Sequence, residues 1–305
     1  MRIIVPPIKS QGIKTKLVEW IFDLAPKNYD KWIEPFLGTG VVALNSGATN
    51  AILNDTNPHI IKFYKGIQDK SITSGMMREY LEKEGKLLSL AGNQGYDHYR
   101  LIRDRFNKEF SPYDFIFLSR AGFNGMMRFG GKGNWNIPFC KKPQRFAQAY
   151  ITKITNQVTG ASKIIRPEPE WIFYNKSFTE IIPLAMPNDF IYCDPPYYGR
   201  YVDYYNGWKE HDEEELFTLL NQTNAKFILS TWHHNDYREN EMIKKHWSHF
   251  NIITKDHFYH SGGKAENRKT IVEALVCNFD IQNMKSHNHG TKEKVDDTQL
   301  VLNLT

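Results

Sequence analysis

The sequence has few cysteines and no long hydrophobic run. Its three cysteines, Cys140, Cys193 and Cys277, lie far apart in a chain of 305 residues and without the short spacings of zinc ligands. We therefore expect a reduced protein with no disulfide framework and no structural metal. No apolar run approaches the roughly 18–20 residues of a membrane-spanning helix, and the N-terminus lacks the apolar stretch of a signal peptide. These absences favour a globular protein of the cytoplasm with no membrane partner.

Acidic residues are missing from one part of the chain. Between Arg120 and Arg145 there are six basic residues and no Asp or Glu. The wider segment 100–150 holds ten Lys and Arg against three acids, although the whole chain carries a net charge of only +5. Phe, Met, Trp and Gly stand between these charges, which is more typical of a polyanion-binding surface than of an ordinary solvated face. Composition therefore favours nucleic acid as a partner.

Short apolar runs predict buried strands, and amphipathic stretches between some of them predict helices. Strands are expected at 32–36, 51–55, 189–194, 226–232 and 273–279, and helices at 15–25 and 213–223. This alternation predicts an α/β fold with a mainly parallel sheet, and it breaks between about residues 60 and 170. The expected division is a catalytic domain at 1–60 and 171–281, an inserted domain at 61–170 and a polar tail at 282–305.

A glycine-containing turn follows the first expected strand. In EPFLGTGVVALN, residues 34–45, the strand leads into Gly38-Thr39-Gly40 and then into an apolar pattern of helical type. Such a turn lets a ligand approach the backbone closely. Asp55 ends the next strand, where nucleotide-binding folds place the carboxylate that accepts the ribose hydroxyls. Together these features indicate a ligand with an adenosine end, and the absence of G-x-x-x-x-G-K-[ST] disfavours a triphosphate.

Another strand end carries a carboxylate and two prolines. The run FIYC, residues 190–193, stops at Asp194, and Pro195, Pro196 and Tyr197 follow. An ionised carboxylate and a proline carbonyl are pure acceptors, and the prolines hold them rigidly. Such acceptors suit a planar amine whose two N–H bonds must be received as its nitrogen attacks, while an aromatic ring stacks on the base. A plain Pro-Pro turn at a strand end is the simpler alternative.

The motif [DN]-P-P-[YFW] after a strand, with a glycine turn upstream, resembles the amino-methyltransferases that use S-adenosyl-L-methionine. PPIKSQGIKTKLVEWI (6–21) and LSRAGFNGMMRFGGKGNWNIPF (118–139) resemble segments of the Dam-like class of DNA adenine-N6 methyltransferases, the D12 class or alpha group. DPPYYGRYVDYYNGW, STWHHNDYREN and NRKTIVEALVCN resemble its branch that serves the EcoRV restriction–modification system. The resemblance covers roughly residues 3–280. It implies a Rossmann-like methyltransferase sheet with an inserted, mainly helical DNA-recognition domain that carries a β-hairpin.

The resemblance also implies roles for individual residues. The catalytic motif would be Asp194, Pro195, Pro196 and Tyr197. Cofactor contacts would come from Lys9, Ser10, Gln11, Lys14, Glu34, Pro35, Phe36, Gly38, Gly40, Asp55, Ser177, Phe178 and Asp194. DNA contacts would come from Arg120, Phe123, Asn124, Met126, Arg128, Lys132, Asn136, Pro138, Lys141 and Lys142. Many members of the class have Asp where this chain has Ser177, and Gly where it has Cys140.

The implied function is transfer of a methyl group from S-adenosyl-L-methionine to N6 of a flipped adenine in duplex DNA. The resemblance implies GATATC, methylated at its first adenine, or a related GAT-containing site. We also expect a monomer in solution, either in a restriction–modification role with a cognate endonuclease or in an orphan role. The alternatives are an RNA adenine or protein glutamine methyltransferase, or a catalytically inactive DNA-binding relative. His233 and His234 have no partners at metal-ligand spacing, so we expect no metal site there.

Overall fold

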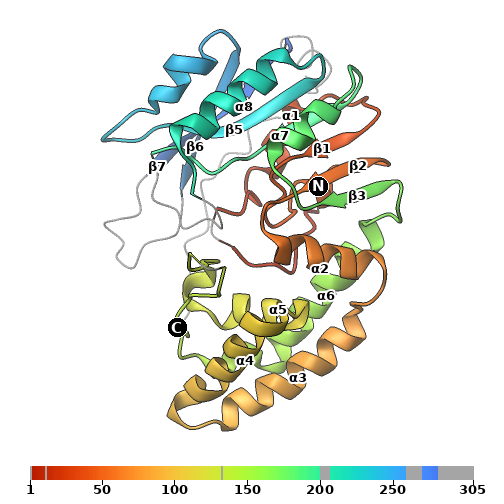
Figure 1. Cartoon of the computed structure of the whole chain (residues 1–305), viewed down its shortest axis with the longest axis vertical. Helices are drawn as coiled ribbons and strands as arrows, with labels where there is room; N and C mark the ends of the chain where they lie inside the picture. Colours follow the sequence, from red (N-terminus) through yellow and green to blue (C-terminus); the bar gives the residue numbers. More distant parts are fainter. Residues whose placement is uncertain (1, 11, 132, 200–206, 259–269, 281–305) are drawn as a thin grey trace, which may run out of the picture.

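The computed structural model describes residues 2–10, 12–131, 133–199, 207–258 and 270–280. Within these ranges the centre of the molecule is a seven-stranded sheet (Figure 1). Its strands are β1 (Trp32–Glu34), β2 (Ala51–Asn54), β3 (Trp171–Tyr174), β4 (Phe190–Cys193), β5 (Lys226–His234), β6 (Asn251–Phe258) and β7 (Thr270–Cys277). Their order in space is β3-β2-β1-β4-β5-β7-β6, and β7 runs antiparallel to both of its neighbours while the other pairs are parallel. The mainly parallel α/β sheet is confirmed.

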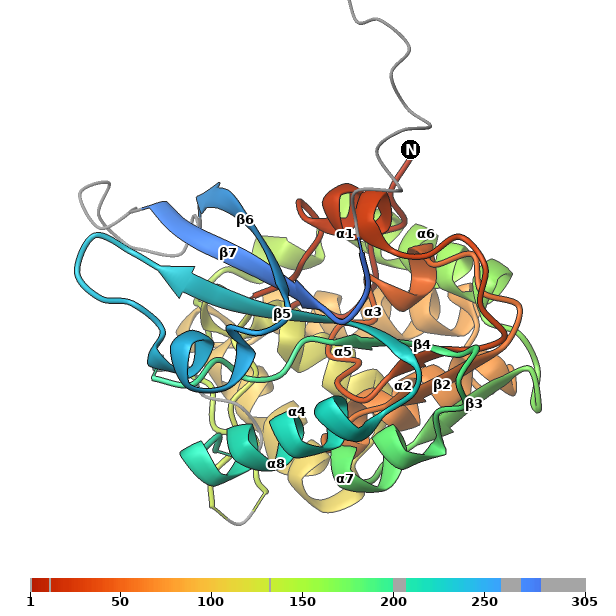
Figure 2. The same ribbon diagram turned by 90° about the horizontal axis from the view of Figure 1, so that it is seen from above.

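The central strands are buried on both faces, because alternate side chains enter two different cores. Trp32 of β1 packs with helix α1 (Val18–Leu24) on one face, whereas Ile33 packs with α7 (Phe178–Ile181) and α8 (Glu210–Gln222) on the other. Tyr192 and Cys193 of β4 divide in the same way. Figure 2 shows α1 on one side of the sheet and α7 and α8 on the opposite side. Burial on both faces explains why these strands are continuous apolar runs in the sequence.

In the described part of the chain, five α-helices stand between β2 and β3. They are α2 (Pro58–Gln68), α3 (Ser74–Leu90), α4 (Tyr96–Glu109), α5 (Pro112–Ala121) and α6 (Gln148–Ile164). In Figure 1, α3, α4 and α5 extend away from the sheet at the bottom of the view. One continuous cluster of buried apolar side chains nevertheless joins them to the sheet, from Trp171 of β3 to Phe117 of α5. The helical insert and one face of the sheet therefore share a core.

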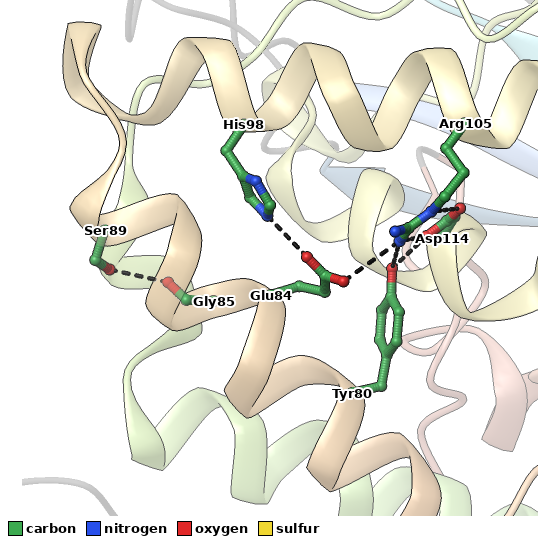
Figure 3. Close-up of polar contacts among 7 residues, drawn as sticks. All are labelled: Tyr80, Glu84, Gly85, Ser89, His98, Arg105 and Asp114. Atoms are coloured by element: carbon green, nitrogen blue, oxygen red, sulfur yellow. Dashed lines mark hydrogen bonds and ion pairs between the residues drawn. The ribbon is translucent and has the colours of Figure 1, made fainter.

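A network of charges, buried at its carboxylates, holds α3, α4 and α5 together (Figure 3). Arg105 donates to Asp114 Oδ2 from Nε at 2.9 Å and to Oδ1 from Nη2 at 2.6 Å. Tyr80 donates to the same carboxylate. Glu84 accepts from Arg105 at 3.5 Å and lies 2.8 Å from Nε2 of His98. Asp114 is fully buried, so these charges are satisfied only when the three helices pack in this arrangement.

The structure differs from the sequence predictions in three elements. Strands β3 and β6, at the two edges of the sheet, were not predicted. The α-helix expected after Gly40 is wrong, because the segment forms only a 3₁₀ turn, η1 (Ala43–Asn45). Its apolar residues are buried as an irregular loop, and β2 begins at Ala51, too soon for an α-helical crossover. The described residues contain no helix long and apolar enough to cross a membrane.

Candidate active site

A cavity of about 420 Å³ opens at the carboxyl ends of the parallel strands. Residues at or just beyond the ends of four strands line it, namely Glu34 of β1, Asp55 after β2, Phe178 after β3 and Asp194 after β4. Strands β1, β2 and β3 follow one another toward one edge of the sheet, and β4 then pairs with the other side of β1. The strand order therefore reverses between β1 and β4. Open α/β sheets bind their ligands at such a switch point, and the volume lies in the range of small-ligand sites.

Most residues that the sequence assigned to a cofactor lie around this cavity. The lining includes Ser10, Lys14, Glu34, Phe36, Gly38, Asp55, Ser177, Phe178 and Asp194. It also includes Met126, which the sequence assigned to DNA. Lys9, Pro35 and Gly40 are not among the described lining residues, and Gln11 lies outside the described residues. Lys9 packs instead against Gly125, where an added Cβ would stand 2.6 Å from Cε of Lys9.

The Asp55 carboxylate holds the glycine turn through a hydrogen bond. Its Oδ2 accepts from the backbone N–H of Gly38 at 2.7 Å, and its Oδ1 accepts from that of Asn57 at 2.8 Å. Gly38 has a φ of +52°, which favours glycine, and Gly40 is fixed by Tyr64, whose hydroxyl oxygen would lie 2.9 Å from an added Cβ. Burial raises the pKa of Asp55 to about 6, although the two backbone hydrogen bonds oppose the shift. Carboxylate oxygens have further lone pairs, so Asp55 retains acceptor capacity for a hydroxyl.

An ion pair ties the N-terminal segment to the strand end at Asp194. Nζ of Lys14 lies 3.0 Å from Oδ1 of Asp194 and 4.7 Å from the centre of the Tyr197 ring. The Lys14 side chain is 6% exposed and that of Asp194 is 22% exposed. Burial raises the pKa of Asp194, and the neighbouring Lys14 ammonium limits the rise. The sequence placed both residues at one site but did not predict that they would pair.

A buried carboxylate on β7 holds the ring of Tyr197. The Tyr197 hydroxyl donates to Oε2 of Glu273 at 2.7 Å and lies 3.3 Å from Oγ of Ser230. Glu273 is fully buried. The orientation of the ring is therefore set from both ends, by Pro196 through the backbone and by Glu273 through the hydroxyl. Glu273 was not predicted from the sequence, because 76 positions separate it from Tyr197 and the sheet brings them together.

Aromatic side chains line the end of the cavity near Ser177. Phe36, Phe178 and Trp208 contact one another, with ring centres 5.3–5.6 Å apart. Nε1 of Trp208 donates at 2.9 Å to Oε2 of the buried Glu213, which fixes the indole ring. Phe36 and Phe178 were predicted from the sequence, whereas Trp208 and Asp212, which also line the cavity, were not.

Between α5 and α6 the chain alternates buried and exposed positions. Trp135, Ile137 and Phe139 are buried, whereas Asn134, Asn136 and Pro138 are exposed. The backbone of Trp135 donates to Oδ1 of Asn107 in α4 at 2.7 Å, which anchors the inner side. Among the described residues of this segment, the expected β-hairpin is present as isolated bridges, which pair Gly122 with Phe139 and Phe129 with Trp135. The outward positions Asn136 and Pro138 belong to the set that the sequence assigned to DNA.

The other DNA candidates differ in exposure. Phe123 is 49% exposed, and Lys141 and Lys142 are exposed. Arg128 is half-buried and donates to the carbonyl oxygen of Asn136 at 3.1 Å. Asn124 lies in the 3₁₀ turn η3 (Phe123–Gly125), and Lys132 lies outside the described residues.

Arg120 turns inward, away from this exposed set. It donates to the carbonyl oxygen of Pro7 and, at 2.8 Å, to Oε1 of Gln157 in α6. Burial and the nearby Arg145 lower the pKa of Arg120 to about 10. These contacts make Arg120 a link between the N-terminal segment and α6.

Comparison with known proteins identifies the family. Residues 10–261 match the model of the D12 class N6 adenine-specific DNA methyltransferases. The chain belongs to this family. The matched range contains every lining residue of the cavity, including Asp194 and the glycine turn.

Curated relatives of this chain include two modification enzymes and several DNA adenine methylases. Modification methylase StsI of Streptococcus sanguinis is 26% identical over 92% of this chain and 44% of its own length. Type II methyltransferase M.FokI of Planomicrobium okeanokoites is 26% identical over 90% of this chain and 42% of its own length. DNA adenine methylase of Haemophilus influenzae is 29% identical over 63% of each chain. The chain thus spans less than half the length of the first two relatives.

Proposed function

We propose that this chain transfers the methyl group of S-adenosyl-L-methionine to N6 of adenine in duplex DNA. One observation carries the proposal: Asp194, at the start of the Asp-Pro-Pro-Tyr sequence, opens into the same cavity as the glycine turn and Asp55. Acceptors for a planar amine therefore stand beside a site suited to a ligand with an adenosine end.

The charged and aromatic side chains of the cavity fit this cofactor. Asp55 offers an acceptor for ribose hydroxyls, and Lys14 offers a cation for the carboxylate of the amino-acid end. Phe178 and Trp208 offer aromatic surfaces for the base. When bound, the cofactor supplies an electrophilic methyl carbon.

The chain's own residues prepare the amine for attack. The Asp194 carboxylate and the Pro195 carbonyl accept its two N–H bonds, so that the nitrogen lone pair leaves the conjugation of the ring. Tyr197, held by Glu273, provides the surface on which the base stacks. A base pair hides adenine N6, so the target adenine must leave the duplex, and we assign to Phe123 and Asn124 the role of filling the gap.

The central experiment measures transfer of a radiolabelled methyl group from S-adenosyl-L-methionine. Duplex DNA, RNA and protein are offered separately, and modified bases are identified by digestion and mass spectrometry. We expect N6-methyladenine in duplex DNA only. Label in RNA or in glutamine side chains, or no transfer despite cofactor binding, would contradict the proposal.

Target recognition is assigned to the insert at 61–170, and sequence specificity to GATATC or a related GAT-containing site. The acid-free segment 120–145 and its exposed Asn136, Pro138, Lys141 and Lys142 support this assignment. The specificity rests on the resemblance to the EcoRV branch. A cytoplasmic monomer with a cognate restriction endonuclease is the setting we propose, in keeping with the modification enzymes among its relatives.

The recognition segment should contain one residue that reads bases and another that holds phosphate. Arg128→Ala should cost about 1–3 kcal/mol of binding on cognate duplex and narrow the gap between cognate and mismatched DNA, because a guanidinium fork suits guanine O6 and N7. Lys142→Ala should weaken all duplexes alike and flatten the salt dependence by about one unit of slope. Titrations on cognate, mismatched and random duplexes at several salt concentrations measure both effects. Equal losses on cognate and random DNA for Arg128→Ala would reverse the assignment.

Cofactor binding should weaken as the pH falls through the raised pKa of Asp55. This pKa is about 6, so the carboxylate is mostly ionised at pH 7 and mostly protonated at pH 5. Because only the ionised form accepts with both oxygens, affinity for S-adenosylhomocysteine should fall about tenfold over this range. Asp55→Asn, which cannot titrate, should bind more weakly at pH 7 and change less with pH. Calorimetry at pH 5, 6 and 7 tests this, and a wild-type affinity that does not vary with pH would refute the role of Asp55.

A further inference from the structure

The aromatic end of the cavity carries two polar side chains with opposite hydrogen-bonding roles. Ser177 and Asp212 both line the cavity, beside Phe178 and Trp208. Ser177 caps α7, Asp212 lies in the first turn of α8, and these two helices contact each other. An aromatic surface with two polar groups at its edge is the usual form of a site for a flat, hydrogen-bonding ring.

Ser177 can offer this site a donor. Its Oγ accepts from the backbone N–H of Thr179 at 3.3 Å and from the Thr179 hydroxyl at 2.8 Å. A hydroxyl oxygen has two lone pairs, and both are used here. What Ser177 can present to a ligand is therefore its O–H.

Asp212 can offer only acceptors. Its Oδ2 accepts from the backbone N–H of Lys209 at 2.7 Å, which holds the carboxylate in place at the start of α8. A carboxylate has about four lone-pair positions, so most of its acceptor capacity remains. The next residue, Glu213, is buried and bonds both Trp208 and Trp247, at 2.9 and 3.1 Å, so the turn that carries Asp212 is held firmly against the cavity.

We propose that Ser177 and Asp212 together read the base of the cofactor and make the cavity specific for adenine. Ser177 donates to a ring nitrogen of the base, and Asp212 accepts from its exocyclic amino group. Adenine presents this acceptor and donor side by side, whereas hypoxanthine presents the reverse, a ring N–H and a carbonyl oxygen. The inference rests on the proposed function, because it assumes an adenosine-bearing ligand in this cavity.

The test compares two ligands that differ only at this edge. Calorimetry measures the Kd of S-adenosylhomocysteine and of S-inosylhomocysteine, with no DNA and no turnover. The wild-type chain should prefer the adenosyl compound by about 10–100-fold, because the wrong base leaves both polar groups without partners. In Asp212→Asn the new amide N–H can donate to the carbonyl oxygen of hypoxanthine, and the preference should fall at least about tenfold.

Two further variants guard against a merely structural effect. Asp212→Asn keeps an oxygen for the Lys209 N–H, so the melting temperature of this variant should equal that of the wild type. Glu215→Gln makes the same charge change on the same helix at a position outside the described lining, and it should leave the preference unchanged. Ser177→Ala, which removes the donor, should lower the preference independently of Asp212.

The outcomes separate this inference from the proposed function. If the wild type binds S-adenosylhomocysteine and Asp212→Asn binds both ligands with an unchanged ratio, the inference is overturned and the proposed function stands. Equal weakening of both ligands would likewise assign Asp212 to the fold of α8 alone. If the wild type binds neither ligand, the proposed function itself fails.

Discussion

Asp194→Ala should lower the rate of methyl transfer about 10²–10³-fold, because the amine loses an acceptor that the prolines hold in place. Single-turnover measurement of labelled methyl transfer to duplex DNA gives this rate. Asp194→Asn should lose less, because the amide oxygen still accepts one hydrogen bond. If the purified Ala variant kept more than about a tenth of the wild-type turnover, the role of Asp194 would be wrong.

The pairing with Lys14 requires a control for this variant. Removing Asp194 leaves the Lys14 ammonium, which is 6% exposed, without the carboxylate 3.0 Å away. Some loss of stability should therefore accompany the loss of rate. Thermal unfolding of Asp194→Ala measures that loss, and single-turnover rates taken well below its melting temperature separate folding from chemistry.

Arg105→Leu should destabilise the protein by about 3 kcal/mol, because the fully buried Asp114 loses both hydrogen bonds from the guanidinium. Tyr80 remains as a donor to this carboxylate but carries no charge to balance it. Urea unfolding followed by circular dichroism measures the loss. Adding Asp114→Asn to Arg105→Leu should restore part of the stability, because an amide costs less to bury than an unpaired carboxylate.

Arg103 offers a matched control on the same helix. It pairs with Asp104 at 2.9 Å, and the two arginine side chains are similarly exposed, at 30% for Arg103 and 37% for Arg105. The carboxylates differ, because Asp104 is 52% exposed and Asp114 is 0% exposed. An exposed pair of this kind contributes about 0–1 kcal/mol, so Arg103→Leu should change the unfolding midpoint little. Equal losses for the Arg103 and Arg105 variants would show that the burial of Asp114 does not strengthen its ion pair.

The sequence predicted the centre of the sheet but not its edges. The predicted strands around Ile33, Ile52 and Ile191 are buried on both faces, and their apolar runs are therefore continuous. The edge strands β3 and β6 were missed because an edge strand exposes part of its side chains and does not form such a run. The segment after Gly40 was wrongly predicted to be an α-helix, because a buried loop has the apolar content of a helix without its length.

The candidate site was predictable where its residues follow a strand within a short motif. Asp55 and Asp194 meet at one cavity because the carboxyl ends of parallel strands lie at the same edge. Glu273, Trp208 and Asp212 belong to no such motif, and only the packing of β7 and α8 brings them to the site. Arg120 shows the converse, since a basic residue inside an apparent DNA-binding segment can serve the interior instead.

The hydrogen bond between Tyr197 and Glu273 makes the site sensitive to the length of β7. Neighbouring side chains of a strand face opposite sides of the sheet, and Ala274 accordingly packs into the core with α7 and α8. A one-residue insertion or deletion in β7 would turn Glu273 away and present Val272 or Ala274 to the tyrosine hydroxyl. Insertions and deletions in this strand should therefore involve even numbers of residues among related sequences. Residues 197 and 273 should likewise change together.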